Sequence, residues 1–184
     1  TRVTTDRLGR GVAVDLADGR VLWRRLFGMT RVYGADLRGG VLGLCGAAVR
    51  RAAPDADPFD APLRGVGEAI DARTGDTIQL IDDLGAETRW VRVAQDGQVV
   101  IGAGVRVVAL DTVTGRIDWS NADEQLAASM DAWIVGDGLV VLARDRVLWM
   151  LSRREGVRQR SPVDTLGRGA DRGWIGLHDR PFGV

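Results

Sequence analysis

Two stretches of the sequence, AVDLADGRVLW at residues 13–23 and ALDTVTGRIDW at residues 109–119, share the pattern Ala-x-Asp-x-x-x-Gly-x-x-x-Trp. A third stretch, AIDARTGDTIQ at 69–79, has Gln79 in place of the tryptophan. The matching residues are Ala13, Asp15, Gly19 and Trp23; Ala69, Asp71 and Gly75; and Ala109, Asp111, Gly115 and Trp119. A fourth copy is degenerate, and its four positions hold Met150, Ser152, Gly156 and Arg160. A phrase that recurs in this way indicates a repeat architecture.

The period of the repeat is that of a propeller blade. The aspartate positions of successive copies, with Ser152 in the last, are 56, 40 and 41 residues apart. A four-stranded blade takes about 40–45 residues. The longer first interval is explained by an insertion, AAVRRAAPDADPFDAPLR at 47–64, which holds three of the five prolines and lacks strand-like alternation. Such a stretch predicts a loop.

Each repeat predicts four short strands. The best-defined copy places them at 90–94, 99–103, 106–110 and 116–119, with a hairpin signal at Asp96-Gly97. The next copy follows the same plan, with Asp137-Gly138 as its first turn. No stretch has the apolar period of a long helix. The sequence therefore predicts an all-β fold, a β-propeller of four-stranded antiparallel blades.

The four motif residues have physical roles at the turn between the third and fourth strands. Glycine adopts the positive φ that such turns require, and the aspartate accepts hydrogen bonds from turn amides. The tryptophan lies on the outermost strand, where its ring can cover the edge of a blade and its N–H can donate a hydrogen bond. The small alanine leaves room for the ring.

These residues resemble the tryptophan-docking motif of the pyrroloquinoline-quinone-like (quinoprotein alcohol dehydrogenase-like) β-propeller repeat family. That family includes quinone-dependent dehydrogenases and a non-catalytic branch similar to the outer-membrane assembly propeller lipoprotein. The resemblance implies that each indole stacks between the alanine of its own motif and the glycine peptide of the next. It also implies a propeller of seven or eight blades in an extracytoplasmic setting, periplasmic or extracellular.

The expected organisation is a single propeller segment over residues 1–184. Its parts are a partial blade 1–27, a blade 30–82 with the insertion 47–64, blades 89–120 and 132–160, and a partial blade 163–184. An open ring leaves unpaired strand edges, which proteins avoid. We therefore expect the segment to belong to a larger propeller. The alternative is a closed four-bladed ring in which the end strands share one blade.

Composition excludes some classes of function. The 25 basic residues, all arginine, balance 25 acidic residues, so the formal net charge is zero. Neutrality without a basic cluster argues against a dedicated nucleic-acid surface. The apolar runs are too short for a transmembrane helix. No signal peptide is recognisable, which is equally true of a fragment or a mature chain.

Residues with reactive side chains are sparse, and no catalytic, cofactor-binding or metal-binding residue is assigned. Cys45 lies in an apolar run and is expected to be a small buried side chain. His178 is the sole histidine, so it cannot build a histidine-rich site, and a surface or strand-end position is expected. The aspartates Asp55, Asp57 and Asp60 depart from the spacing of a calcium loop. They are expected to lie in a solvated loop.

The function that these observations favour is a non-catalytic scaffold that binds protein partners and needs no cofactor. Long loops in compact domains are usually functional or disordered, which makes the insertion the main candidate contact. Candidate partner contacts are Arg51, Asp55, Asp57, Phe59 and Asp60 in the insertion, and Arg158 and Arg160 in the fourth repeat. Two alternatives stay open: a fragment of a quinone-dependent dehydrogenase, and a closed four-bladed ligand-binding ring. Against the dehydrogenase, the chain lacks the cysteine pair that the family's cofactor site uses.

Overall fold

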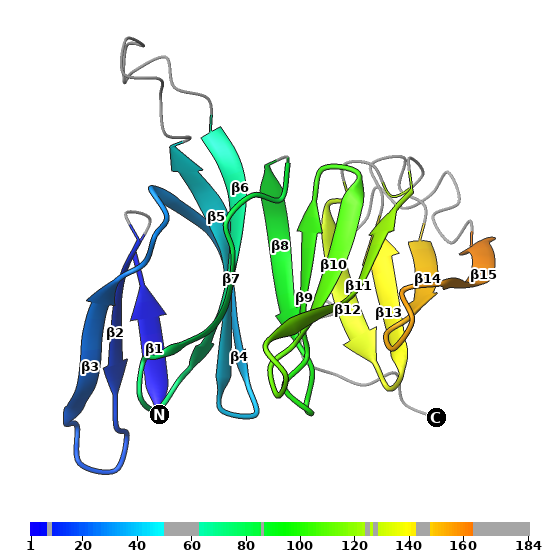
Figure 1. Ribbon diagram of the computed structural model, residues 1–184. Coiled ribbons are helices and arrows are strands. Elements are labelled where there is room, and N and C mark those ends of the chain that lie inside the picture. The colour runs from blue at the N-terminus through cyan, green and yellow to red at the C-terminus, as the bar shows by residue number, and fades with distance from the viewer. Residues whose placement is uncertain are drawn as a thin grey trace, which may run out of the picture.

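The computed structural model describes residues 1–6, 9–49, 63–85, 87–123, 126, 129–142 and 148–163, with the backbone alone for 158–163. These residues form fifteen β-strands, and none of them lies in an α-helix. The strands make four antiparallel sheets, in each of which neighbouring strands follow one another along the chain (Figure 1). The prediction of an all-β fold built from small antiparallel sheets is confirmed.

The first sheet has three strands and the other three sheets have four. The first sheet contains β1 (Arg2–Thr5), β2 (Arg10–Val14) and β3 (Val21–Leu26). The second contains β4 (Arg31–Arg38), β5 (Val41–Val49), β6 (Leu63–Asp71) and β7 (Thr77–Ile81). The third contains β8 (Thr88–Val93), β9 (Val99–Ala103), β10 (Arg106–Asp111) and β11 (Arg116–Ala122). The fourth contains β12 (Asp131–Val135), β13 (Gly138–Leu142), β14 (Leu148–Ser152) and β15 (Arg158–Val163).

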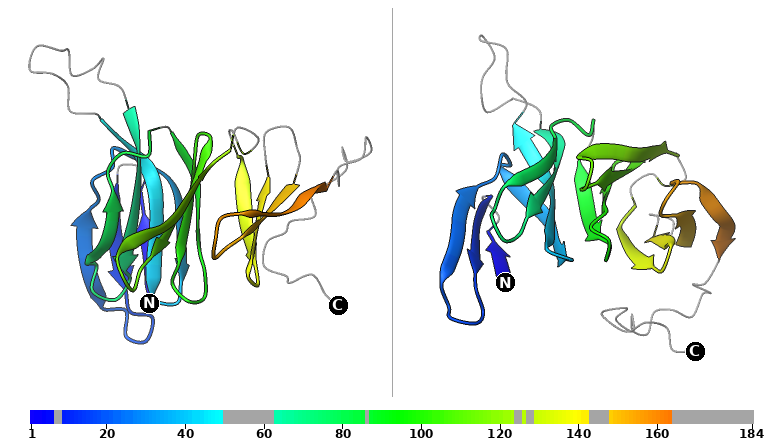
Figure 2. Two further views of the ribbon diagram at one scale, coloured as in Figure 1. Left: turned by 45° about the vertical axis from the view of Figure 1, so that its right-hand side comes forward. Right: turned by 60° about the horizontal axis from the view of Figure 1, so that its bottom comes forward.

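The sheets follow one another in an arc, with the first and the fourth at its two ends (Figure 2). Strand β8 contacts both β4 and β12, so the first strands of the second, third and fourth sheets are neighbours. The motif alanine lies on β6 and β10, which are the third strands of the second and third sheets, and on β2, the middle strand of the first sheet. By this correspondence, β1, β2 and β3 match the second, third and fourth strands of a blade. The innermost position beside β1 is not filled by any described residue.

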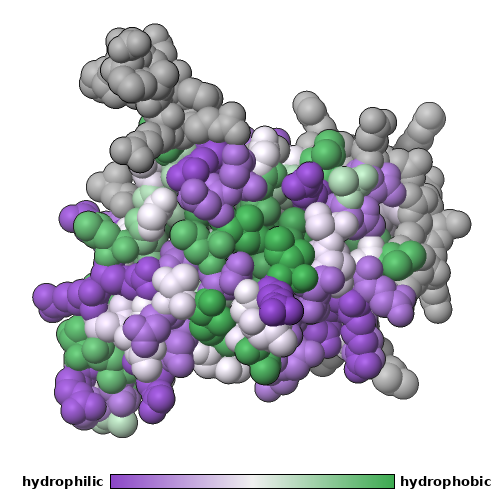
Figure 3. Space-filling model, in the orientation of Figure 1, coloured by the Kyte–Doolittle hydropathy of each residue, from purple (hydrophilic) through white to green (hydrophobic). Residues whose placement is uncertain are grey.

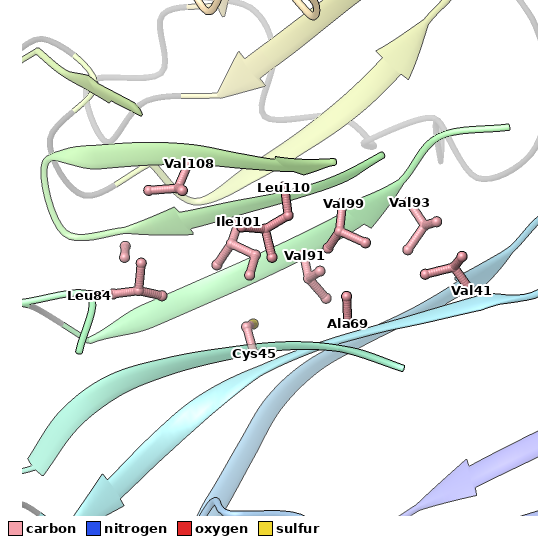
Figure 4. Close-up of a cluster of buried hydrophobic side chains, with 11 residues drawn as sticks. Val41, Cys45, Ala69, Leu84, Val91, Val93, Val99, Ile101, Val108 and Leu110 are labelled. Atoms are coloured by element: carbon pink, nitrogen blue, oxygen red, sulfur yellow. The ribbon is translucent and has the colours of Figure 1, made fainter. Parts of the chain in front are cut away.

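Neighbouring sheets pack face to face, and we call these three interfaces the first, second and third seams. A separate cluster of buried side chains fills each seam. In the second seam, side chains of the second sheet such as Val41 and Cys45 meet Val91, Val93 and Ile101 of the third (Figure 4). The hydrophobic core is thus divided into layers between the sheets.

Strand β5 shows how the sequence produces this layering. It is buried along eight of its nine residues. Leu42 and Leu44 belong to the first-seam cluster, whereas Val41 and Cys45 belong to the second. Because successive side chains of a strand point to opposite faces, a continuous apolar run such as VLGLCGAAV fits a strand that is covered on both sides. Gly43 lets the third sheet approach, since a Cβ there would lie 2.8 Å from Val91.

Three local features differ from the sequence-based expectations. The insertion is shorter than 47–64, because Ala47 to Val49 and Leu63 continue β5 and β6, with Val49 paired to Leu63. Ala47 and Ala48 are buried in the sheet, which explains why they remain strand. The positive φ of the first turn in the fourth sheet falls at Gly136, while Gly138 begins β13. Val163, expected to start another blade, ends β15 and pairs with Leu148.

Candidate functional site

The motif tryptophans lie at the outer ends of the seams. Trp23 stands on β3 opposite Ala13 of β2, and Trp119 stands on β11 opposite Ala109 of β10. Both alanines are fully buried. An irregularity in strand pairing follows each alanine, and a β-bulge of this kind reorients the side chains next to it.

In the first seam, the indole of Trp23 covers the motif turn of the second sheet. Its Nε1 donates a hydrogen bond of 2.9 Å to the carbonyl oxygen of Ala72. A Cβ on Gly75 would lie 2.8 Å from the ring. Trp23 is 9% exposed. Glycine is required at position 75 for two reasons, the contact with the ring and a φ of 81°.

In the third seam, Trp119 makes the equivalent contacts with the fourth sheet. Its Nε1 donates to the carbonyl oxygen of Arg153 at 2.7 Å, and its ring lies against Gly156. Arg153 follows Ser152 just as Ala72 follows Asp71, so the acceptor is in both cases the residue after the motif aspartate position. The two seams repeat one arrangement of ring, glycine and carbonyl.

A second donor stands two residues after each tryptophan. Arg25 donates to the carbonyl oxygen of Gly75 and pairs with Glu68 at 2.8 Å. Asn121 donates to the carbonyl oxygen of Gly156 at 2.7 Å. Thr77 donates to the same Glu68 oxygen that Arg25 contacts, at 2.6 Å. Sequence reasoning missed Arg25 and Asn121. The signal that could have found them is their position, two residues after each motif tryptophan.

The second seam has neither the indole nor the second donor. Gln79 occupies the tryptophan position opposite Ala69, and Ile81 occupies the position two residues later. Ile81 packs against the buried cluster of this seam, which includes Val108 of the third sheet. Val108 stands in the place that Glu68 has in the second sheet, one residue before the motif alanine. The two positions that hold a polar pair in the first seam are therefore held by apolar residues in the second.

The motif aspartates hold the turns that receive these contacts. Asp15, Asp71 and Asp111 each accept a hydrogen bond from the backbone amide two residues later, at 2.8–2.9 Å. The side chain of Thr114 also donates to Asp111, and these two bonds hold the pKa of the Asp111 carboxyl below its ordinary value. The glycines that close the turns, at positions 19, 75, 115 and 156, all have positive φ.

A polar cluster joins the third and fourth sheets at the end that carries these turns. Arg153, 7% exposed, forms a two-pronged ion pair with Asp96 at 2.8 and 3.0 Å and lies 3.6 Å from Asp137. Asp96 and Asp137 stand on the first turns of the two sheets. Partial burial raises the pKa of Asp96, but the hydrogen bond and charge of Arg153 outweigh it, so the pKa is below its ordinary value.

The insertion is carried by the longest strands of the structure, β5 and β6, at nine residues each. They extend toward the top of Figure 1. The paired residues at the tip, Val49 and Leu63, are 41% and 50% exposed. Behind them, Arg64 pairs with Asp82 at 2.7 Å. Two apolar side chains therefore stand at the base of residues 50–62.

Several predicted residues fall outside the described part of the chain. They are Arg51, Asp55, Asp57, Phe59, Asp60 and His178. Arg158 and Arg160 lie on β15, where the backbone alone is described, and Arg160 pairs with Met150. Cys45 is buried as expected, and burial raises the pKa of its thiol to about 12, so the thiol stays protonated.

Neither metal-ligand clusters nor membrane-spanning helices occur among the described residues. No group of three or more His, Cys, Asp or Glu side chains there is placed to hold a metal ion. Within the same residues, no helix has the length and apolar character needed to cross a membrane.

Comparison with known proteins rests on structure. No family model matches the sequence, and no curated protein matches it. The chain is similar to the computationally designed Ika8 protein, with a TM-score of 0.66 and 16% identity over 86% of this chain and 44% of that one. It is similar to BamB from Moraxella catarrhalis, with a TM-score of 0.64 and 15% identity over 92% of this chain and 48% of that one.

A third similar structure has a length closer to that of this chain. The computationally designed Ika4 protein gives a TM-score of 0.62 and 13% identity over 82% of this chain and 83% of that one. The fold is a β-propeller fold. At these identities the likeness establishes the fold alone. This chain spans about half the length of Ika8 and BamB.

We predict that Trp23 is a major source of stability. Trp23→Ala should lower the free energy of unfolding by about 3–5 kcal/mol, because it removes a large buried ring. Trp23→Phe keeps an aromatic ring but loses the bond to Ala72, and should cost less than the alanine variant. Urea unfolding monitored by circular dichroism measures both. The control is Leu26→Ala, a residue 71% exposed on the same strand. A cost below about 1 kcal/mol for Trp23→Ala would contradict this role.

We also predict a pH-dependent contribution from the Asp96–Arg153 pair. Because the pKa of Asp96 is lower in the folded state, the pair stabilises the fold above the unfolded pKa of about 3.9. That contribution is lost as the pH falls through the folded-state pKa. Asp96→Asn should therefore be less stable than the wild type at pH 7, with a difference that narrows toward pH 3. Urea unfolding across this range measures it, and an unchanged difference would refute the assignment.

Proposed function

We propose that this chain is a non-catalytic part of a β-propeller that acts as a protein-interaction scaffold, with residues 50–62 as its main partner contact. The observation that carries the proposal is the projecting hairpin of β5 and β6, which ends in the exposed pair Val49 and Leu63. Exposed apolar side chains next to a long connection provide the mixture of apolar and polar groups that partner-binding loops use.

The strand that leads into the insertion is closely packed. Strand β5 is buried on both faces, and its neighbours in the first and second seams are packed clusters. A binding segment held on a rigid base loses less conformational freedom when a partner binds, which favours affinity. The candidate contacts Arg51, Asp55, Asp57, Phe59 and Asp60 all belong to this segment.

We further propose that the four sheets belong to a larger ring. Two observations support this idea: no described residue fills the innermost position of the first sheet, and this chain spans about half the length of Ika8 and BamB. The sequence resemblance to the family that contains the outer-membrane assembly propeller lipoprotein supports an assembly role outside the cytoplasm, periplasmic or extracellular, without a bound cofactor. Arg158 and Arg160 remain candidates for a second contact with an acidic partner.

The insertion can be removed without disturbing the paired strands. Replacing residues 50–62 with Asn-Gly connects Val49 and Leu63 by a two-residue turn that suits a β-hairpin. The variant should keep the circular dichroism spectrum and melting temperature of the wild type to within a few degrees. It should lose the partner that a photo-crosslinker at position 59 captures from cell-envelope extract of the source organism.

The matched control is the same crosslinker at Val105, an exposed residue in the β9–β10 turn of the third sheet. That position should not capture the partner. Capture of the same partner by the shortened variant, assayed with the purified partner on an affinity surface, would overturn the assignment of residues 50–62.

A further inference from the structure

The second seam contains a place that the other two seams fill with an indole. Trp23 lies over Gly75 in the first seam and Trp119 lies over Gly156 in the third. The equivalent glycine of the second seam is Gly115, and among the described residues no aromatic ring covers it. The nearest atoms to a Cβ placed there would be the carbonyl oxygen of Ile78 at 3.6 Å and the side-chain oxygen of Gln79 at 3.7 Å.

The carbonyl group that would receive the indole N–H is also in place. Ala72 and Arg153 supply the acceptors in the filled seams, and each directly follows the motif aspartate position. The corresponding residue of the third sheet is Thr112. The turn that presents it is held by Asp111, as the turn of the second sheet is held by Asp71. The β10–β11 turn therefore presents the same glycine and the same carbonyl as the two occupied turns.

Exposed aliphatic side chains flank the uncovered glycine. Val113 is 87% exposed and Ile117 is 50% exposed, on either side of Gly115. The residue equivalent to Ile117 in the second sheet is Thr77, which is polar and bonded to Glu68. Figure 3 shows a hydrophobic area in the middle of this face of the molecule, in the region between β7 and β11. The outer end of the second seam is thus apolar where the equivalent end of the first is polar.

We propose that this outer end of the second seam, formed by Thr112, Gly115, Ile117 and Gln79, binds a tryptophan side chain presented by a partner protein. The ring lies over the Gly115 peptide and against Ile117, and its N–H donates to the carbonyl oxygen of Thr112. Gln79 is half-buried and has rotatable bonds that let its side chain swing outward. An indole is the occupant because the other two copies of this place hold one, with the same glycine and the same acceptor.

The test uses N-acetyl-L-tryptophanamide as the probe and the full 184-residue chain labelled with nitrogen-15. Amide resonances of Gly115 and Ile117 should shift saturably as the probe is added. Those of Gly75 and Gly156 should stay in place, because Trp23 and Trp119 already cover them. N-acetyl-L-leucinamide, which has no ring and no side-chain N–H, should shift Gly115 at least tenfold more weakly at equal concentration.

Two variants separate this binding place from a general hydrophobic surface. Gln79→Trp should supply the indole from within the chain, weaken probe binding at least tenfold and raise the melting temperature. Leu80→Trp is the matched control, since position 80 is exposed and pairs with Glu68, which faces the first seam. It should leave binding unchanged. Ile117→Thr introduces the residue type found at position 77 and should weaken binding several-fold.

The outcomes are distinct from those that test the insertion. Shifts at Gly115 no larger than those at Gly75 up to the solubility limit of the probe would overturn this proposal, as would wild-type binding in Gln79→Trp. The variant that lacks residues 50–62 should bind the probe as the wild type does. If that variant loses partner capture and still binds the probe, both proposals are supported. If it still captures the partner, only the assignment of residues 50–62 as the partner contact is refuted.

Discussion

The packing of neighbouring sheets against one another determines where the other features of this protein lie. A single repeat of a repeat protein cannot bury its hydrophobic face alone, so each sheet must cover the next. Strand β5 shows the consequence in its side chains, which alternate between the first-seam and second-seam clusters. Glycines such as Gly43 and Gly67 remove bulk where side chains of the third sheet enter. The turns, the insertion and the outer contacts all take their positions from these layers.

The contacts at the outer ends of the seams determine how each sheet is placed against the next, which burial of apolar surface alone does not do. Trp23 and Trp119 combine a large apolar ring with one directed hydrogen bond, which fixes how far each sheet is displaced along the next. The partly buried pair of Arg25 and Glu68 adds a charge contact in the first seam, where removal of Arg25 would leave the buried Glu68 carboxylate without its charge partner. The second seam replaces these polar groups with Ile81 and Val108. Its outer end is therefore apolar, and the glycine there has fewer close contacts than in the other two seams.

Much of the architecture could be predicted from the sequence because short-range chemistry determines it. Positive φ at Gly19, Gly75, Gly115 and Gly156 and the hydrogen bonds of the motif aspartates depend on a few adjacent residues. The alternation of strands and turns also depends on short stretches of neighbouring residues. The ends of the insertion were misjudged because Ala47 and Ala48 have weak strand preference, and their burial in the sheet decides their conformation. The partners of Arg25, Asn121 and Arg153 could not be predicted, because each contacts another repeat at least 34 residues away in the chain.

Contact between a tryptophan and the glycine of the next repeat joins the sheets of the first and third seams, and a double-mutant cycle on Trp119 and Gly156 measures its strength. Gly156→Ala places a methyl group against the ring and strains a backbone with a φ of 67°. The backbone strain is common to both backgrounds and cancels in the cycle, whereas the clash exists only when Trp119 is present. Gly156→Ala should destabilise the wild type more than it destabilises Trp119→Ala, with an interaction energy of about 1–3 kcal/mol. Effects that add to within about 0.5 kcal/mol would contradict it.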